Sequence, residues 1–258
     1  MAIPEPVGGF LVDLDGTVVE GGKLVPGAAE VLRMLARKEI PYRIVTNTTS
    51  KPRSAILAQM RTLGLELRPE QVITAPIIGR DYLNSEGITR CFPLLKSSLL
   101  EDLTPIEFVE SSPQAVLVGD LGDDLTYAAL NRAFRFILDG AAFITLARNR
   151  YFRGADGLCL DVGSLVAALE YATQAEAVLI GKPAREFFLF ACRNMAVPCE
   201  STVVIGDDLE ADVAGAMATG AAGVGVRTGK FRAAQLEKSA IVPDMILDSL
   251  ADLPDLLS

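Results

Sequence analysis

Two carboxylates separated by one leucine interrupt the apolar segment FLVDLDGTVV, residues 10–19. Asp13 and Asp15 would repel each other unless a cation lies near them or one of them takes a proton. Gly16 follows directly and permits a tight turn that brings Asp15 to the same place as Asp13. Magnesium suits such a pair, because it accepts one or two carboxylates and bridges to a substrate phosphate.

This arrangement predicts a specific chemistry. Asp13 can attack phosphorus and form an aspartyl-phosphate. Asp15 can give a proton to the leaving oxygen and later take one from water. The pair therefore predicts Mg²⁺-assisted transfer of a phosphoryl group.

Further polar residues follow other predicted strands. RIV ends at Thr46 and Asn47, LIG ends at Lys182, and VVIG ends at Asp207 and Asp208. In an open parallel sheet, ligands bind beyond the carboxyl ends of the strands. We expect these groups to converge with Asp13 on one crevice that holds a divalent cation and a phosphoryl group.

The elements that must position these residues alternate between short β-branched runs and helical patterns, which is typical of a parallel sheet with crossover helices. We expect core strands at 9–13, 42–47, 177–181, 202–208, 223–226 and 245–250. We expect helices at about 27–38, 50–64, 183–195 and 209–220. The predicted core is an α/β, Rossmann-like, doubly wound parallel sheet.

A segment of roughly a hundred residues lies between the second and third groups of polar residues and has strand and helix patterns of its own. A crossover of that length is an inserted domain rather than a loop. We therefore predict a core formed by residues 1–77 and 179–258, with a smaller α/β cap domain inserted at 78–178.

Composition excludes several classes of protein. The 258 residues include 24 basic and 33 acidic ones, a net charge of −9, which argues against nucleic acid or an anionic membrane as partner. The absence of histidine excludes Ser-His-Asp and Cys-His nucleophiles and histidine-ligated metals. Four scattered cysteines, no signal-peptide pattern and no long apolar run predict a cytoplasmic protein that does not enter a membrane.

Four motifs in order resemble those of the haloacid dehalogenase superfamily: DLDGT at 13–17, TN at 46–47, GKP at 181–183 and GDDLEAD at 206–212. The large insert between the second and third motifs resembles the NagD-like branch. The resemblance implies a phosphatase with Mg²⁺ as cofactor and a small phosphorylated metabolite as substrate. Caps of this branch often make dimer contacts, so a homodimer is one expectation.

The resemblance also implies roles. Asp13 would be the nucleophile and a magnesium ligand, Asp15 the acid/base and a ligand through its backbone carbonyl, and Asp207 a further ligand. The phosphate-binding positions would be Leu14, Thr46, Asn47 and Lys182. The supporting positions would be Gly16, Thr17, Asp208 and Asp212.

Five arginines lie close together in the insert: Arg132, Arg135, Arg148, Arg150 and Arg153. They can form a solvated basic face. Alternatively, the family resemblance places Asn149, Arg150 and Arg153 on a cap segment that binds the leaving group of the substrate. The sequence leaves both interpretations open.

Three functions remain to be compared. The first is a phosphatase that acts on a small phosphomonoester, a pyrophosphate or a phosphoamide. The second is a phosphoryl transferase or mutase that passes the same aspartyl-phosphate to a sugar. The third is a phosphoryl-accepting signalling receiver, which would have no insert of this size.

Overall fold

The computed structural model describes residues 3–154, 157–232, 236 and 240–257. The chain divides into two compact units, one formed by Met1–Thr46, Ile56–Ile73 and Lys182–Ser258, the other by Asn47–Ala55 and Thr74–Gly181. These divisions lie close to the predicted boundaries at 77/78 and 178/179, although residues 47–55 join the second unit. The assignment of the second unit as a cap stays a prediction.

The first unit is built on a six-stranded sheet with the order β15-β14-β13-β1-β4-β5. Its strands are β1 (Gly9–Asp13), β4 (Tyr42–Thr46), β5 (Val72–Thr74), β13 (Thr202–Gly206), β14 (Ala222–Val226) and β15 (Met245–Leu247). β1 lies between β13 and β4 and pairs with both in parallel. Every residue of β1 is buried, which explains its unbroken apolar sequence up to Asp13.

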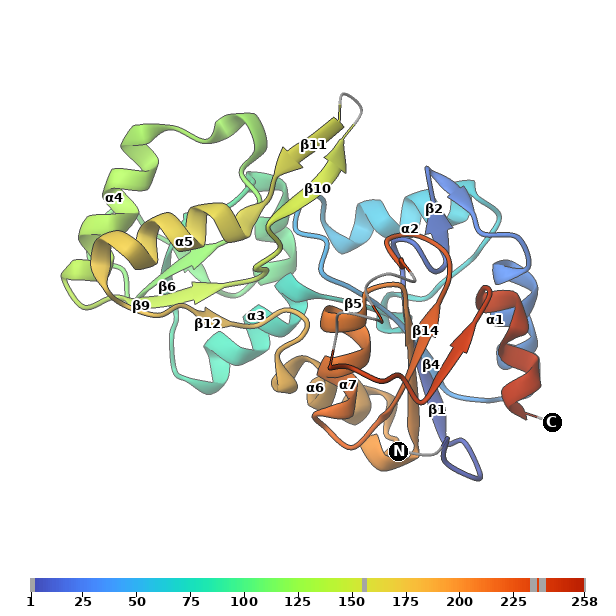
Figure 1. The fold of residues 1–258 in the computed structure, drawn as a ribbon. Helices are drawn as coiled ribbons and strands as arrows, with labels where there is room; N and C mark the ends of the chain where they lie inside the picture. The colour runs from blue at the N-terminus through green and yellow to red at the C-terminus, as the bar shows by residue number, and fades with distance from the viewer. Residues whose placement is uncertain (1–2, 155–156, 233–235, 237–239, 258) are drawn as a thin grey trace. The chain divides into compact units, whose positions relative to one another are not determined.

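Helices cover both faces of this sheet, as Figure 1 shows for α1 (Ala28–Arg37) and α6 (Arg185–Met195). On the α1 side, Phe10 and Val12 of β1 join Leu32 and Leu35 in one apolar core. The C-terminal helix η6 (Leu250–Leu257) packs against α1. The predicted doubly wound α/β core is confirmed.

The first unit contains several further elements. They are β2 (Val19–Glu20), β3 (Lys23–Leu24), α2 (Arg53–Thr62), whose first residues belong to the second unit, η1 (Pro69–Gln71), η4 (Cys199–Ser201), η5 (Leu209–Ala214) and α7 (Gly215–Met217). The predicted helix at 209–220 is therefore two elements. Its first part, η5, is a π-helical turn rather than an α-helix.

The second unit has its own parallel sheet, with the order β12-β9-β8-β6-β7. Its strands are β6 (Arg90–Leu94), β7 (Glu107–Phe108), β8 (Ala115–Val118), β9 (Ala142–Thr145) and β12 (Val178–Leu179). Helices α4 (Tyr127–Leu138) and α5 (Val162–Thr173) cover one face (Figure 1) and supply residues to its apolar core. The remaining elements are α3 (Ala75–Ser85), η2 (Ser97–Leu103), η3 (Gly122–Asp124) and the hairpin of β10 (Tyr151–Gly154) and β11 (Gly157–Leu160).

The expectation that LIG, residues 179–181, ends a core strand is wrong. β12 pairs with β9 in the second sheet, with Val178 opposite Ile144 and Leu179 opposite Thr145. The chain leaves α5, which packs on that sheet, and β12 pairs with the nearest edge strand. Lys182 therefore enters the first unit from a connection rather than from the end of a core strand.

Two glycines face each other on neighbouring core strands, but their surroundings differ. Gly206 of β13 is in register with Gly225 of β14. A Cβ added at Gly206 would overlap the Asp212 carboxylate, whereas the atom nearest to a Cβ at Gly225 is 3.6 Å away. The missing side chain at Gly206 thus makes room for a buried acid.

We predict that Gly206→Ala lowers the free energy of unfolding by about 1–3 kcal/mol, because the Asp212 carboxylate is buried and hydrogen bonded and cannot move aside. Gly225→Ala is the matched control and should be neutral or stabilising by up to about 1 kcal/mol. Urea unfolding measures both values. Equal effects at the two positions would contradict this account.

Candidate active site

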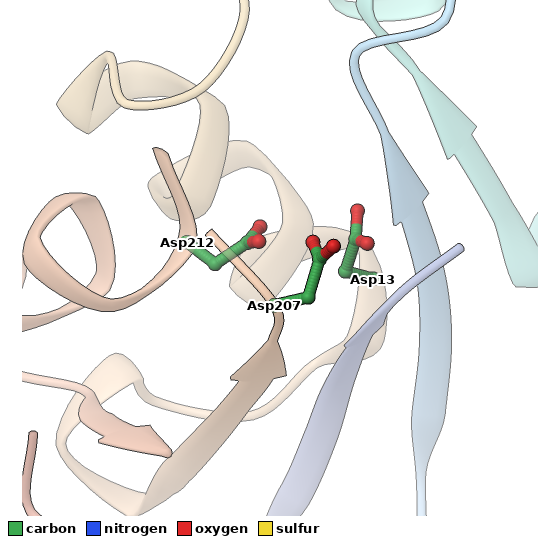
Figure 2. A group of neighbouring side chains, drawn as sticks. All are labelled: Asp13, Asp207 and Asp212. Carbon is green, nitrogen blue, oxygen red and sulfur yellow. The ribbon is translucent and has the colours of Figure 1, made fainter. Parts of the chain in front are cut away.

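Three buried carboxylates meet beyond the carboxyl ends of β1 and β13. Asp13, Asp207 and Asp212 are 5%, 3% and 1% exposed, and one oxygen from each lies within 4.8 Å of the others. Figure 2 shows the three carboxylates gathered in one region. The predicted convergence of Asp13 and Asp207 therefore exists in the structure, and Asp212 joins them.

The turn after β1 brings the main chain close to Asp207. Gly16 has a φ of +97°, and its N–H donates to Val19 O at 2.7 Å. A Cβ at Gly16 would overlap Oδ2 of Asp207. Glycine is needed here both for the turn and for the approach of the carboxylate.

The turn at 208–213 orients Asp212. The side-chain Oδ1 of Asp208 accepts hydrogen bonds from the N–H groups of Glu210 and Ala211. The backbone carbonyl of Asp208 accepts hydrogen bonds from the N–H groups of Asp212 and Val213. Such a widened turn is frequent at functional sites. The N–H of Asp208 donates to Oδ2 of Asp212 at 3.2 Å, so that Oδ1 of Asp212 bonds Lys182.

Lys182 lies between two of the acids. Its Nζ donates to Oδ1 of Asp13 at 2.5 Å and to Oδ1 of Asp212 at 2.6 Å, and the side chain is 3% exposed. Burial alone would lower the pKa of Lys182, but the two carboxylates outweigh it and raise that pKa. Lys182 is therefore a protonated, buried cation.

The acids outnumber this cation. Burial raises the pKa of Asp13 and of Asp212, while Lys182 opposes the rise in both. Burial raises the pKa of Asp207 to about 7, and the charge of Asp212 adds to the shift. Within this group, three carboxylates face one lysine, so that a bound cation would relieve their mutual repulsion.

Asp15 and the second motif have fewer described contacts. Asp15 is exposed, and the buried hydroxyl of Thr46 donates to its Oδ2 at a long 3.4 Å. Asn47, the next residue, belongs to the second unit. Its side chain lies close to Gly181, because a Cβ added at Gly181 would be 2.7 Å from Oδ1 of Asn47. The predicted phosphate contacts of Thr46 and Asn47 stay predictions.

Two residues of the first motif, Leu14 and Thr17, have buried side chains. Leu14 has its side chain in the core, its N–H donates to Val45 O at 3.2 Å, and its carbonyl accepts from Val18 and Val19. Thr17 is fully buried, and its Oγ1 has no hydrogen-bond partner in the described part of the chain. The phosphate-binding role of Leu14 and the supporting role of Thr17 stay predictions.

Two of the five arginines that lie close together in the insert make ion pairs. Arg148 pairs with Glu170 at 2.6 Å, and Arg132 pairs with Glu110 and lies 4.9 Å above the Phe92 ring, so both have structural roles. Asn149 and Arg150 precede β10, and their carbonyls accept hydrogen bonds from Gly163 and Asp161. The side chain of Arg153 lies outside the described part. The specificity role of Asn149, Arg150 and Arg153 stays a prediction.

Sequence reasoning missed a loop that follows β14. Lys230 N–H donates to Oδ2 of Asp207 at 2.6 Å, and Thr228 Oγ1 donates to the carbonyl of Gly16 at 2.5 Å. The available signal was position, since RTGK follows the core strand GVGV at its carboxyl end.

Comparisons with known proteins agree with the motifs. The family model described as "Haloacid dehalogenase-like hydrolase" matches residues 10–108, and the one described as "HAD-hyrolase-like" matches 179–253. Human haloacid dehalogenase-like hydrolase domain-containing protein 2 is 37% identical over 99% of this chain and 97% of its own length. Human phospholysine phosphohistidine inorganic pyrophosphate phosphatase is 34% identical over 97% of this chain and 94% of its own.

Solved structures share the fold over nearly the whole chain. The 4-nitrophenylphosphatase of Thermotoga maritima has a TM-score of 0.91 and 26% identity, covering 98% of both chains. A glycerol phosphate phosphatase of Mycobacterium tuberculosis, solved in complex with magnesium, has a TM-score of 0.87 and 26% identity over 98% of this chain and 78% of that one. NagD of Escherichia coli has a TM-score of 0.88 at 24% identity, over 98% of both chains, which shows the shared fold.

Identity above 30% over nearly the full length of two relatives confirms the resemblance predicted from the four motifs. The chain belongs to the haloacid dehalogenase-like hydrolase family and is a phosphatase of that family.

Proposed function

We propose that this phosphatase hydrolyses a small phosphorylated metabolite with the help of Mg²⁺, through an aspartyl-phosphate on Asp13. The observation that carries the proposal is the buried group of Asp13, Asp207 and Asp212 around Lys182. Phosphoryl transfer depends mainly on positioning and on stabilising charge, and this group supplies both.

The donor set fits magnesium. Mg²⁺ is a hard cation that prefers oxygen ligands and binds through one or two carboxylates. The side chains of Asp13 and Asp207 and the backbone carbonyl of Asp15 would hold it, with Asp212 as a third nearby carboxylate. When bound, Mg²⁺ supplies positive charge that offsets the acids and the incoming phosphate.

The residues of the chain perform the bond changes. Lys182 donates to Oδ1 of Asp13 at 2.5 Å and holds this carboxylate in place, and one of its two oxygens attacks phosphorus. The new oxygen–phosphorus bond forms as the bond to the leaving oxygen breaks, and Asp15 donates a proton to that oxygen. Asp15 then takes a proton from water, the water oxygen attacks phosphorus, and inorganic phosphate leaves while the Asp13 carboxylate is restored.

The two alternative functions, a mutase and a receiver domain, make different predictions. A mutase on the same core would return the phosphoryl group to a sugar, so that inorganic phosphate would not accumulate from a monophosphate. A receiver domain would lack the second unit, and membership of the hydrolase family argues against it. A phosphomonoester, a pyrophosphate or a phosphoamide are all open as substrates.

Other expectations stay predictions: a homodimer, a cytoplasmic location, and no nucleic-acid or membrane partner. All four cysteines are free thiols and three of them are buried, in agreement with a reducing compartment. Among the described residues, we find no helix with the length and apolar character required to cross a bilayer.

We predict that Asp13→Asn lowers the kcat for p-nitrophenyl phosphate by at least about 10³-fold, because the nucleophile is lost. Removing divalent metal with EDTA should abolish turnover, and added Mg²⁺ should restore it. Released inorganic phosphate and p-nitrophenol measure both effects.

Asp102→Asn is the matched control. Asp102 is also a buried acid, but it accepts the Arg53 N–H at 2.7 Å in the second unit. Its variant should keep the kcat of the folded protein. Full activity in Asp13→Asn, or turnover without metal, would refute the proposed mechanism.

We predict that Mg²⁺ raises the melting temperature more at pH 8 than at pH 5.5. The pKa of Asp207 is about 7 in the metal-free protein, so that at pH 5.5 a proton competes with the metal for this carboxylate. At pH 8, Mg²⁺ at about 100 times its Kd should stabilise by about 2.7 kcal/mol, or about 5–10 °C for a chain of this size.

The raised pKa of Asp207 also sets how the stability of the metal-free protein changes with pH. The pKa of Asp207 is higher in the folded than in the unfolded chain, so the folded state binds more protons between about pH 4 and 7. This group therefore makes the metal-free protein less stable as the pH rises through that window. Asp207→Asn should remove this contribution and much of the Mg²⁺ effect, and an equal Mg²⁺ shift at both pH values would contradict the prediction.

A further inference from the structure

The loop of residues 228–230, which follows β14, contacts the acidic group from outside the four motifs. We propose that this 228–230 loop is a positioning element for Asp207: it holds Oδ2 of that carboxylate against the main chain, so that Oδ1 is presented to the cation. The inference rests on the proposed magnesium-dependent function and adds a determinant of metal affinity to it.

The first contact is a hydrogen bond to the carboxylate. The backbone N–H of Lys230 donates to Oδ2 of Asp207 at 2.6 Å, and Asp207 is only 3% exposed. Hydrogen bonds to an ionised acceptor are shorter and stronger than neutral ones. This bond therefore favours one orientation of the carboxylate.

The second contact is steric. Gly16 and Gly229 both lie so close to Oδ2 of Asp207 that a Cβ on either would overlap it. The two glycines also touch each other, because a Cβ at Gly229 would lie 2.6 Å from the Cα of Gly16. Gly229 has a φ of +61°, which favours glycine in any case. The oxygen is thus enclosed by main chain from two distant parts of the sequence.

The third set of contacts ties the loop to the first motif. Thr228 Oγ1 donates to the carbonyl of Gly16 at 2.5 Å, and the Gly229 N–H donates to Oε1 of Glu20 at 3.2 Å. Gly16 follows Asp15 directly, so that the same loop fixes the turn after β1 and the acid after β13. Groups that orient metal ligands in this way commonly change metal affinity when they are lost.

The Lys230 side chain does not make the hydrogen bond to Asp207, although its charge acts on the acids. It is 58% exposed, and its Nζ lies 3.7 Å from Oδ2 of Asp208. The hydrogen bond to Asp207 comes from the main chain and survives a change of side chain. This separates the effect of the loop geometry from the effect of the lysine charge.

The test measures metal binding without substrate, with Mn²⁺ followed by electron paramagnetic resonance and Mg²⁺ by calorimetry. Thr228→Val should raise the Kd for the metal by about 10–100-fold. Thr228→Ser, which keeps the hydroxyl, should bind like the wild type. Lys230→Gln, which keeps the N–H, should stay within about threefold of the wild type or bind tighter, since it removes a positive charge near the acids.

Thr202→Val is the matched control. Thr202 is buried, and its hydroxyl donates to Pro198 O at 2.9 Å at the amino end of β13, about 16 Å from Asp207 along the strand. Its Kd should equal that of the wild type even if its melting temperature falls. In turnover assays, Thr228→Val should need more Mg²⁺ for half-maximal activity, while kcat at saturating Mg²⁺ stays within a few-fold.

The outcomes separate this inference from the proposed function. If the wild type binds neither Mn²⁺ nor Mg²⁺, the proposed magnesium-dependent function fails and the inference fails with it. If the wild type binds and Thr228→Val binds equally well, or if Thr202→Val loses as much affinity, only the positioning role is overturned. A loss of affinity in Lys230→Gln as large as in Thr228→Val also overturns it.

Discussion

The ammonium group of Lys182, buried between Asp13 and Asp212, is the interaction on which the rest of the site depends. It joins the end of β1, the chain entering from the second unit, and the turn of η5. A charge this deeply buried is tolerated only with partners, and removal of one partner typically costs about 3–5 kcal/mol. The folded state is therefore stable only when these three segments lie together.

The same interaction leaves the site short of positive charge. Lys182 alone cannot balance Asp13, Asp207 and Asp212, and the pKa of Asp207 is raised, first by burial and then by the charge of Asp212. A protein that only needed stability would be better served by fewer buried acids. This excess of negative charge favours binding of a divalent cation. The bound cation in turn favours binding of the negatively charged phosphate.

Features that depend on patterns over whole strands could be predicted from the sequence, whereas features that depend on single contacts could not. β1, β4 and β13 and the convergence of their terminal residues could be predicted, because apolar runs and the parallel-sheet rule act over whole strands. The partner of β12 could not, because two apolar residues do not specify which sheet edge they join. The π-turn at 209–214 depends on backbone hydrogen bonds, which residue types alone do not encode. The position of the 228–230 loop after β14 could be predicted by the parallel-sheet rule, but its backbone hydrogen bond to Asp207 could not.

The glycines show why side-chain motifs describe only part of such a site. The glycine of DLDGT permits a turn, but the structure adds a second reason: Gly16 leaves room for the carboxylate of Asp207, as Gly206 does for that of Asp212. In this group, whose carboxylate oxygens lie within 4.8 Å of one another, a Cβ at any of these glycines would displace one of the acids. The arrangement of charge is thus set as much by absent side chains as by the acids themselves, and a substitution that leaves every acid in place can still disrupt the site.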